Sequence, residues 1–220
     1  MTGKEPVVFL SDIHLRADRG GFVFRGLNLT VEPGQSAVII GPSGSGKSTL
    51  VELMIGLRRP DQGRVSLFGR DLRKKREFRS ARRQIGGVGG PFALVPSLTV
   101  AENISLPLVL NAEHSSVKRE RLFRILSEFS LLKLAGKYPS QLTRVENTLV
   151  QFARAVIANQ PLMLIDEPAS GLDPANYERV TEFLVRMALS GRSLMILASQ
   201  PPPGQIPGVV TRYLRDGVIE

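Results

Sequence analysis

The segment that most constrains this 220-residue chain is residues 41–49. They read Gly-Pro-Ser-Gly-Ser-Gly-Lys-Ser-Thr and fit the phosphate-binding pattern G-x-x-x-x-G-K-[ST]. An apolar, β-branched run, Ser36–Ile40, precedes the segment and predicts a buried strand, whereas Lys47–Leu57 has leucines at helical spacing. Strand, loop and helix in this order are the context that the pattern requires, so the sequence predicts a nucleoside-triphosphate site.

Each part of this segment has a physical use in holding phosphate. Glycines let backbone N–H groups curl around an anion, and the start of the helix adds roughly half a positive charge. Lys47 would reach the β- and γ-phosphates, and the Ser48 hydroxyl would bind Mg²⁺. A plain glycine turn before a helix would explain neither the lysine nor the hydroxyl. The predicted nucleotide-binding residues here are Gly41, Pro42, Ser43, Gly44, Ser45, Gly46, Lys47, Ser48 and Thr49.

Two carboxylates after a second buried run predict the other half of the site. Leu162–Ile165 is continuously apolar and is followed by Asp166 and Glu167. An aspartate at the end of such a strand can hold Mg²⁺, and Glu167 could polarise the attacking water as a general base. The alternative is that these residues form only a polar strand end.

Composition excludes several other kinds of chemistry. The chain has no cysteine and only two histidines, His14 and His114, so disulfides, thiolate catalysis and a histidine-rich metal site are not expected. It has no apolar run of 18 residues and no apolar segment near its start that would resemble a signal peptide. A cytoplasmic protein is the simplest expectation.

The net charge of +9 comes in large part from one run, residues 70–83. Such a run most often forms a solvated helix face. It could also favour an anionic membrane surface, at about 1 kcal/mol per basic residue near the headgroups. Nucleic acid is a weaker interpretation, because Phe78 is the only aromatic residue in the run, and no nucleic-acid partner is predicted.

Alternating strands and helices predict an α/β fold with a parallel sheet covered on both sides. The glycine-rich segment 84–91 is expected to end the basic helix, and no clear strand appears between Pro91 and Gln141. We therefore predict one domain over residues 1–220 with an inserted helical lobe at approximately 91–145. Strands are expected at 7–15, 22–31, 65–68, 162–165, 193–198 and 209–214, and helices at 70–83, 146–158 and 174–189.

With both halves of the site in place, the chain resembles the ATP-binding subunit of an ATP-binding-cassette (ABC) transporter over nearly its whole length. Gly41–Thr49 is similar to the family's Walker A motif, Leu162–Glu167 to its Walker B motif, and Ser170–Asp173 to the D-loop that touches the opposite subunit. Glu102–Leu108 looks most like the small subunits of lipoprotein release, macrolide export and cell division, with the phospholipid-trafficking group as the second choice. The resemblance implies a P-loop NTPase fold of ABC type, with an antiparallel N-terminal β part.

Four motifs depart from the family pattern. The signature Leu-Ser-Gly-Gly-Gln aligns with residues 142–146, where Thr143 keeps a hydroxyl but Arg144 and Val145 replace the glycines. The Q-loop glutamine aligns with Gly90 and the switch histidine with Gln200, and the aromatic residue expected near 16–18 to stack on adenine is missing. Arg144 could bind the γ-phosphate across the dimer interface as an arginine finger does, or could point into solvent.

The resemblance implies an ATP hydrolase that binds MgATP at a dimer interface and drives a membrane permease from the cytoplasmic face. Glu167 would be catalytic, Ser48 and Asp166 would hold Mg²⁺, and Thr143, Arg144 and Asp173 would contact nucleotide. The dimer could contain two copies of this chain or a second ABC subunit. The altered positions leave open a nucleotide-gated scaffold with little or no hydrolysis.

Overall fold

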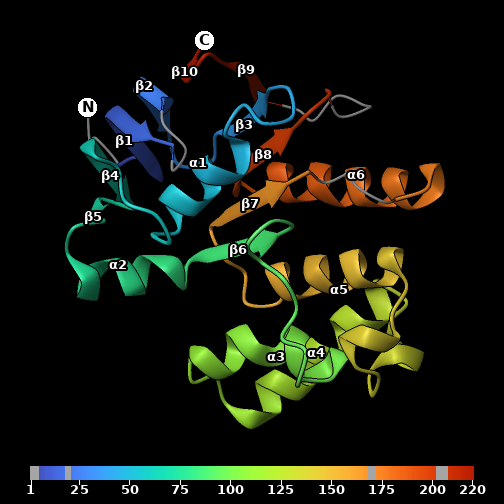
Figure 1. Ribbon diagram of the computed structural model, residues 1–220. Helices are drawn as coiled ribbons and strands as arrows, with labels where there is room; N and C mark the ends of the chain where they lie inside the picture. Colours follow the sequence, from blue (N-terminus) through green and yellow to red (C-terminus); the bar gives the residue numbers. More distant parts are fainter. Residues whose placement is uncertain (1–4, 18–20, 168–171, 202–207) are drawn as a thin grey trace.

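The computed structural model describes residues 5–17, 21–167, 172–201 and 208–220, and Figure 1 gives its element labels. The strands are β1 (Val8–Arg16), β2 (Phe22–Val31), β3 (Ser36–Ile40), β4 (Gln62–Leu67), β5 (Arg70–Asp71), β6 (Ile85–Val88), β7 (Leu162–Asp166), β8 (Ser193–Ala198), β9 (Val209–Arg215) and β10 (Val218–Ile219). The helices are α1 (Lys47–Met54), α2 (Lys75–Arg82), α3 (Val100–Leu110), α4 (Ser115–Glu128), α5 (Arg144–Val156) and α6 (Pro174–Leu189), with 3₁₀ turns at Leu132–Leu134 and Pro139–Gln141. Among the described helices, none is long and apolar enough to cross a membrane.

The strands form two sheets, as the sequence predicts. The larger has the order β10-β9-β3-β8-β7-β6, and β6 to β9 all run parallel to β3 within it. The smaller has the order β2-β1-β4-β5, with antiparallel pairs. The α/β class, the mainly parallel core sheet and the antiparallel N-terminal part are therefore confirmed.

The centre of the larger sheet is buried on both faces. Alternate residues of β3, β7 and β8 belong to two different apolar clusters: Val38 and Ile165 lie in one, and Ile39 and Leu164 in the other. Residues of α5 and α6 pack in the first cluster, whereas α1 and the smaller sheet pack in the second (Figure 1). This double cover explains why these strands are continuously apolar.

Residues 84–91 end the basic helix, as expected, and Ile85–Val88 within them also forms β6, an edge strand beside β7 that is not among the predicted strands. A Cβ on Gly86 would lie 2.1 Å from the Ala155 carbonyl oxygen, and one on Gly87 would lie 2.1 Å from the Phe92 ring. The glycines therefore serve close packing against α5 and Phe92 and do not break the strand.

Residues 89–161, all of them described, contain helices and turns but no strand. A capping box starts α3, since Thr99 Oγ1 accepts from the Glu102 N–H and the Glu102 carboxylate accepts from the Thr99 N–H. Helix α5 begins two residues earlier than expected because Thr143 and Glu146 form the same kind of cap. The limits of a helical lobe at 91–145 stay a prediction.

Two predicted helices are shorter than expected. Helix α1 ends at Met54 rather than Leu57, and Gly56 follows in a left-handed turn with φ of 71°. The basic run is not helical from Arg70, because Arg70 and Asp71 pair with β4 as β5. The helix α2 starts only at Lys75.

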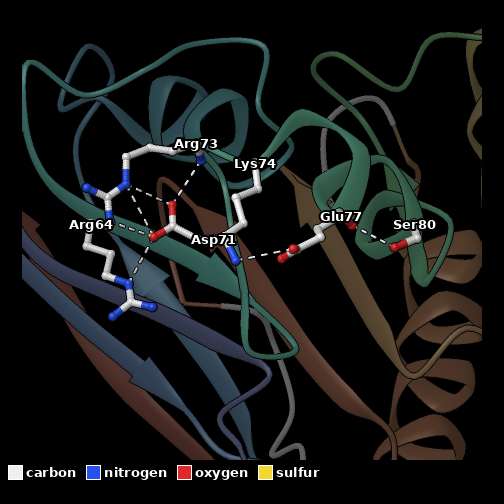
Figure 2. Close-up of polar contacts among 6 residues, drawn as sticks. All are labelled: Arg64, Asp71, Arg73, Lys74, Glu77 and Ser80. Atoms are coloured by element: carbon white, nitrogen blue, oxygen red, sulfur yellow. Dashed lines mark hydrogen bonds and ion pairs between the residues drawn. The ribbon is translucent and has the colours of Figure 1, made fainter.

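Asp71 organises the start of the basic run (Figure 2). Its carboxylate accepts hydrogen bonds from the Arg73 backbone N–H at 2.9 Å and the Arg73 guanidinium at 2.7 Å, and it forms an ion pair with Arg64 at 3.1 Å. The Arg73 side-chain hydrogen bond is the main cause that lowers the pKa of Asp71 from 3.8 to about 2. These bonds hold the chain in the turn between β5 and α2.

We expect Asp71→Asn to lower the free energy of unfolding at pH 7 by about 1 kcal/mol, a value reduced for the solvent exposure of both arginines. The folded pKa is lowered, so the stabilisation is present above pH 4 and is lost as the pH falls through about 2. Urea unfolding of both proteins should therefore show a smaller difference at pH 3 than at pH 7. A difference that is equal at the two pH values would contradict this role of the carboxylate.

Candidate functional site

The segment between β3 and α1 is a tight loop whose glycines meet specific steric needs. Gly44 and Gly46 have left-handed φ values of 81° and 100°, and Gly46 is the N-cap of α1. A Cβ on Gly41 would lie 2.5 Å from Ser45 Oγ, so the loop closes on itself at this glycine. This geometry leaves the first N–H groups of α1 unpaired within the helix, which suits the binding of an anion.

Lys47 lies under this loop with only 6 % of its side chain exposed. Its ammonium donates to the carbonyl oxygens of Gly41 at 2.8 Å and Pro42 at 3.0 Å. It also forms an ion pair with Glu167 at 3.3 Å. The predicted phosphate-binding lysine and the predicted catalytic carboxylate are thus in direct contact.

Ser48 and Asp166 form the second contact between the two motifs. The Ser48 hydroxyl donates to Asp166 Oδ2 at 2.8 Å, and Asp166 is only 5 % exposed. Burial is the main cause that raises the pKa of the Asp166 carboxyl, and the hydrogen bond from Ser48 opposes it. Asp166 Oδ1 is buried and has no hydrogen-bond partner among the residues that the structure describes.

These two side chains fit a Mg²⁺ ion that arrives with phosphate. Mg²⁺ prefers oxygen ligands and is commonly held by one or two carboxylates together with substrate oxygens. The unpaired Asp166 Oδ1 and the neighbouring Ser48 hydroxyl supply that kind of donor. No group of three or more carboxylates and histidines placed to hold a metal by themselves occurs in the described part of the chain.

Glu167 comes directly after β7 in a left-handed conformation, with φ of 55°. Its carboxylate accepts from the Ser199 hydroxyl and, at 3.2 Å, from the Ser199 N–H. Sequence analysis missed Ser199. A sequence signal for Ser199 was present: it comes directly after β8, just as Glu167 comes directly after β7, and the two strands are neighbours in the sheet.

Several of the residues predicted to bind nucleotide or Mg²⁺ line a cavity of about 540 Å³. Ser48, Asp166 and Glu167 line it together with Thr143 and Arg144 at the start of α5. Asp173 has a different position: it caps α6 by accepting from the Asn176 N–H at 3.0 Å, which lowers its pKa. Ser170 and Gly171 of the predicted D-loop lie outside the described residues.

The glycine at the Q-loop position has a structural reason. Gly90 has a left-handed φ of 44°, and a Cβ there would lie 2.5 Å from Asp166 Oδ2. There is no room for a glutamine side chain unless the loop moves away from this carboxylate. At the switch position, Gln200 follows Ser199, which supplies both of the hydrogen bonds to Glu167 described above.

A second cavity, of about 830 Å³, adjoins the phosphate-binding loop. Pro42–Ser45 line it together with Phe22, Arg25 and Asp216. Phe22 is 46 % exposed, and the Arg25 guanidinium lies 5.4 Å from its ring centre. In the sequence Phe22 is expected only as part of the strand 22–31, because the family pattern places the adenine-stacking aromatic residue near 16–18.

Comparison with known proteins agrees with this geometry. Residues 24–170 match the family described as "ABC transporter". The chain is 30 % identical over 192 residues to the cell division ATP-binding protein FtsE of Bacillus subtilis strain 168, covering 86 % of this chain and 84 % of that protein. It is 35 % identical over 179 residues to the lipoprotein-releasing system ATP-binding protein LolD 1 of Rhodopirellula baltica, covering 79 % and 77 %.

A solved structure is also similar along nearly the whole length. The dimeric ATP-binding cassette MJ0796, in a post-hydrolysis state bound to ADP and Pi, has a TM-score of 0.83 and 28 % sequence identity, covering 97 % of this chain and 96 % of that one. Sequence, fold and the paired Walker-type residues point to the same conclusion. The chain belongs to the ABC transporter family, as an ATP-binding subunit with ATP hydrolase activity.

Proposed function

We propose that this subunit binds MgATP between the loop 41–46 and the end of β7, in a dimer, and couples its hydrolysis to a membrane permease. The observation that carries the site is the hydrogen bond from Ser48 to the buried Asp166, whose Oδ1 has no partner among the described residues; both residues line the same cavity as Glu167. Mg²⁺ bound there would neutralise part of the charge of the phosphates. Ser48 and Asp166 hold the ion, and Lys47 binds the β- and γ-phosphates.

In this proposal Glu167 orients the attacking water and accepts its proton. The ion pair with Lys47 and the bonds from Ser199 hold its carboxylate in place beside the cavity. The similar cassette MJ0796 is dimeric, and we propose a dimer here, of two copies or with a second ABC subunit. Thr143 and Arg144 contact nucleotide from the start of α5, and Asp173 lies near the partner subunit.

We propose that the permease docks on a groove between α2, β6 and α3, on the cytoplasmic face of the membrane. The groove has a volume of about 590 Å³ and combines apolar residues such as Leu106 and Leu110 with three exposed arginines, Arg79, Arg82 and Arg83. Gln160, which is 4 % exposed, also lines the groove, and its Oε1 has no partner among the described residues. An apolar segment with acidic residues complements this surface.

Replacing Lys47 with alanine should weaken MgATP binding at least tenfold, because charge-assisted hydrogen bonds to phosphate are worth roughly 1.5–3 kcal/mol each. Isothermal titration calorimetry of the purified protein measures this. Lys133→Ala, on an exposed 3₁₀ turn, is the matched control and should bind as the parent does. An unchanged dissociation constant for Lys47→Ala would rule out the proposed phosphate site.

Glu167→Gln should abolish steady-state phosphate release while MgATP still binds, since the amide can orient water but cannot accept a proton at neutral pH. Gel filtration with MgATP should then show more dimer than the parent gives. Glu178→Gln, on the exposed face of α6, is the control for loss of one carboxylate. Phosphate release by Glu167→Gln at the parental rate would remove Glu167 from the chemistry.

Reversing Arg79, Arg82 and Arg83 to glutamate should release the protein from membranes containing its permease, with ATP affinity unchanged. Flotation compares native membrane vesicles with protein-free liposomes of phosphatidylethanolamine and phosphatidylglycerol. If the parent protein binds the native vesicles but not the liposomes, and the variant binds neither, the result supports a permease. If the parent binds the liposomes as well as it binds the vesicles, the arginines contact anionic lipid. Reversal of Lys118, Arg119 and Arg124 on α4 controls for net charge, and equal recovery of the two variants would contradict the groove.

A further inference from the structure

Gln151 makes a contact that the ATP-binding motifs do not account for. It lies in the middle of α5 and lines the same cavity as Ser48 and Asp166. Its Oε1 accepts a hydrogen bond from the Gly89 N–H at 2.8 Å, and its Nε2 donates to Asn147 Oδ1 at 2.7 Å. Both ends of the amide are thus engaged, which fixes its orientation between the helix and the turn after β6.

The turn that Gln151 holds lies directly on the Asp166 residue. A Cβ on Gly89 would lie 2.0 Å from the Asp166 backbone oxygen, and one on Gly90 would lie 2.5 Å from its Oδ2. Gly89 and Gly90 both have left-handed φ values, 76° and 44°. The Gly89-Gly90 turn therefore forms one wall of the space around the carboxylate, and the Gly89 N–H bonds this wall to Gln151.

We propose that Gln151 is a positioning residue of the nucleotide site, which holds the Gly89-Gly90 turn against Asp166 and so ties the metal-binding carboxylate to α5. This inference rests on the proposed MgATP site. Helix α5 begins at Arg144, next to Thr143, and both line the cavity. A shift of α5 thereby reaches Asp166 through the Gln151 amide, which bonds the turn itself, whereas Arg154 on the same helix bonds the carbonyl oxygens of Phe92 and Ala93 just after it.

A purely structural role of Gln151 and a positioning role predict different effects of Mg²⁺ on ATP binding by a Gln151 variant. If Gln151 positions Asp166, Gln151→Met should weaken ATP binding in the presence of Mg²⁺ about fivefold, the change expected from one ordinary hydrogen bond, and leave ATP binding in EDTA unchanged. Gln151→Glu keeps the acceptor oxygen for the Gly89 N–H and should restore the Mg²⁺-dependent part. Asn147→Ala is the matched control, because it removes the other bond of the same amide and leaves the bond to Gly89.

Calorimetry with and without Mg²⁺ on the four proteins gives this comparison. The parent's own response to Mg²⁺ tests the MgATP site: no difference between Mg²⁺ and EDTA in the parent would reject the proposed function itself. An equal loss in Mg²⁺ and EDTA for Gln151→Met, or no loss in either, would overturn the inference about Gln151 alone.

Hydrogen exchange on the unmodified protein gives a second test that does not depend on how well a variant folds. With ATP bound, addition of Mg²⁺ should slow exchange in peptides covering residues 86–90 and in α5 together. Slowing confined to the loop 41–48 and β7 would overturn the proposed link.

Discussion

The hydrogen bond between Ser48 and Asp166 joins two segments that lie 118 residues apart in the chain. It can form because β3 and β7 are parallel to β8, which lies between them, so their carboxyl ends meet at one edge of the sheet. The polar residues at this edge follow strands that are buried along their whole length. The apolar packing on both faces of the sheet thus determines where the chemistry can take place.

Most of the fold follows from signals that are local in the sequence. Helix α6 and strand β8 have the limits predicted for them, since Asp173 caps the helix before Pro174 and an uninterrupted apolar run forms the strand. The limits of α2 and the existence of β6 depend instead on distant contacts. Arg64 on β4 helps to hold Asp71 outside the helix, and the glycines of β6 can be understood only with Ala155 and Phe92 in place.

The residues of the site also differ in whether local sequence signals identify them. Lys47, Ser48, Asp166 and Glu167 were predictable because two motifs with known spacing contain them, although their individual roles remain predictions. Ser199, Gln151 and Phe22 belong to no motif at their positions. Each becomes visible only when the fold places it beside a motif residue: Ser199 on Glu167, Gln151 on the turn at Asp166, and Phe22 beside the loop 42–45.

ATP hydrolysis at this site requires the contact between Lys47 and Glu167 to change. Lys47 is buried and its ammonium already has a carboxylate and two carbonyl oxygens as partners. A phosphate that binds to this ammonium competes with Glu167 for its charge, because a second anion beside an unneutralised carboxylate is unfavourable at this distance. The Ser199 hydroxyl and N–H donate to the same carboxylate and do not depend on Lys47, so they would stay in place when the phosphate arrives. Loss of the Lys47 contact would free the ammonium for the nucleotide, while the bonds from Ser199 would keep Glu167 beside the cavity, where a water molecule could reach it.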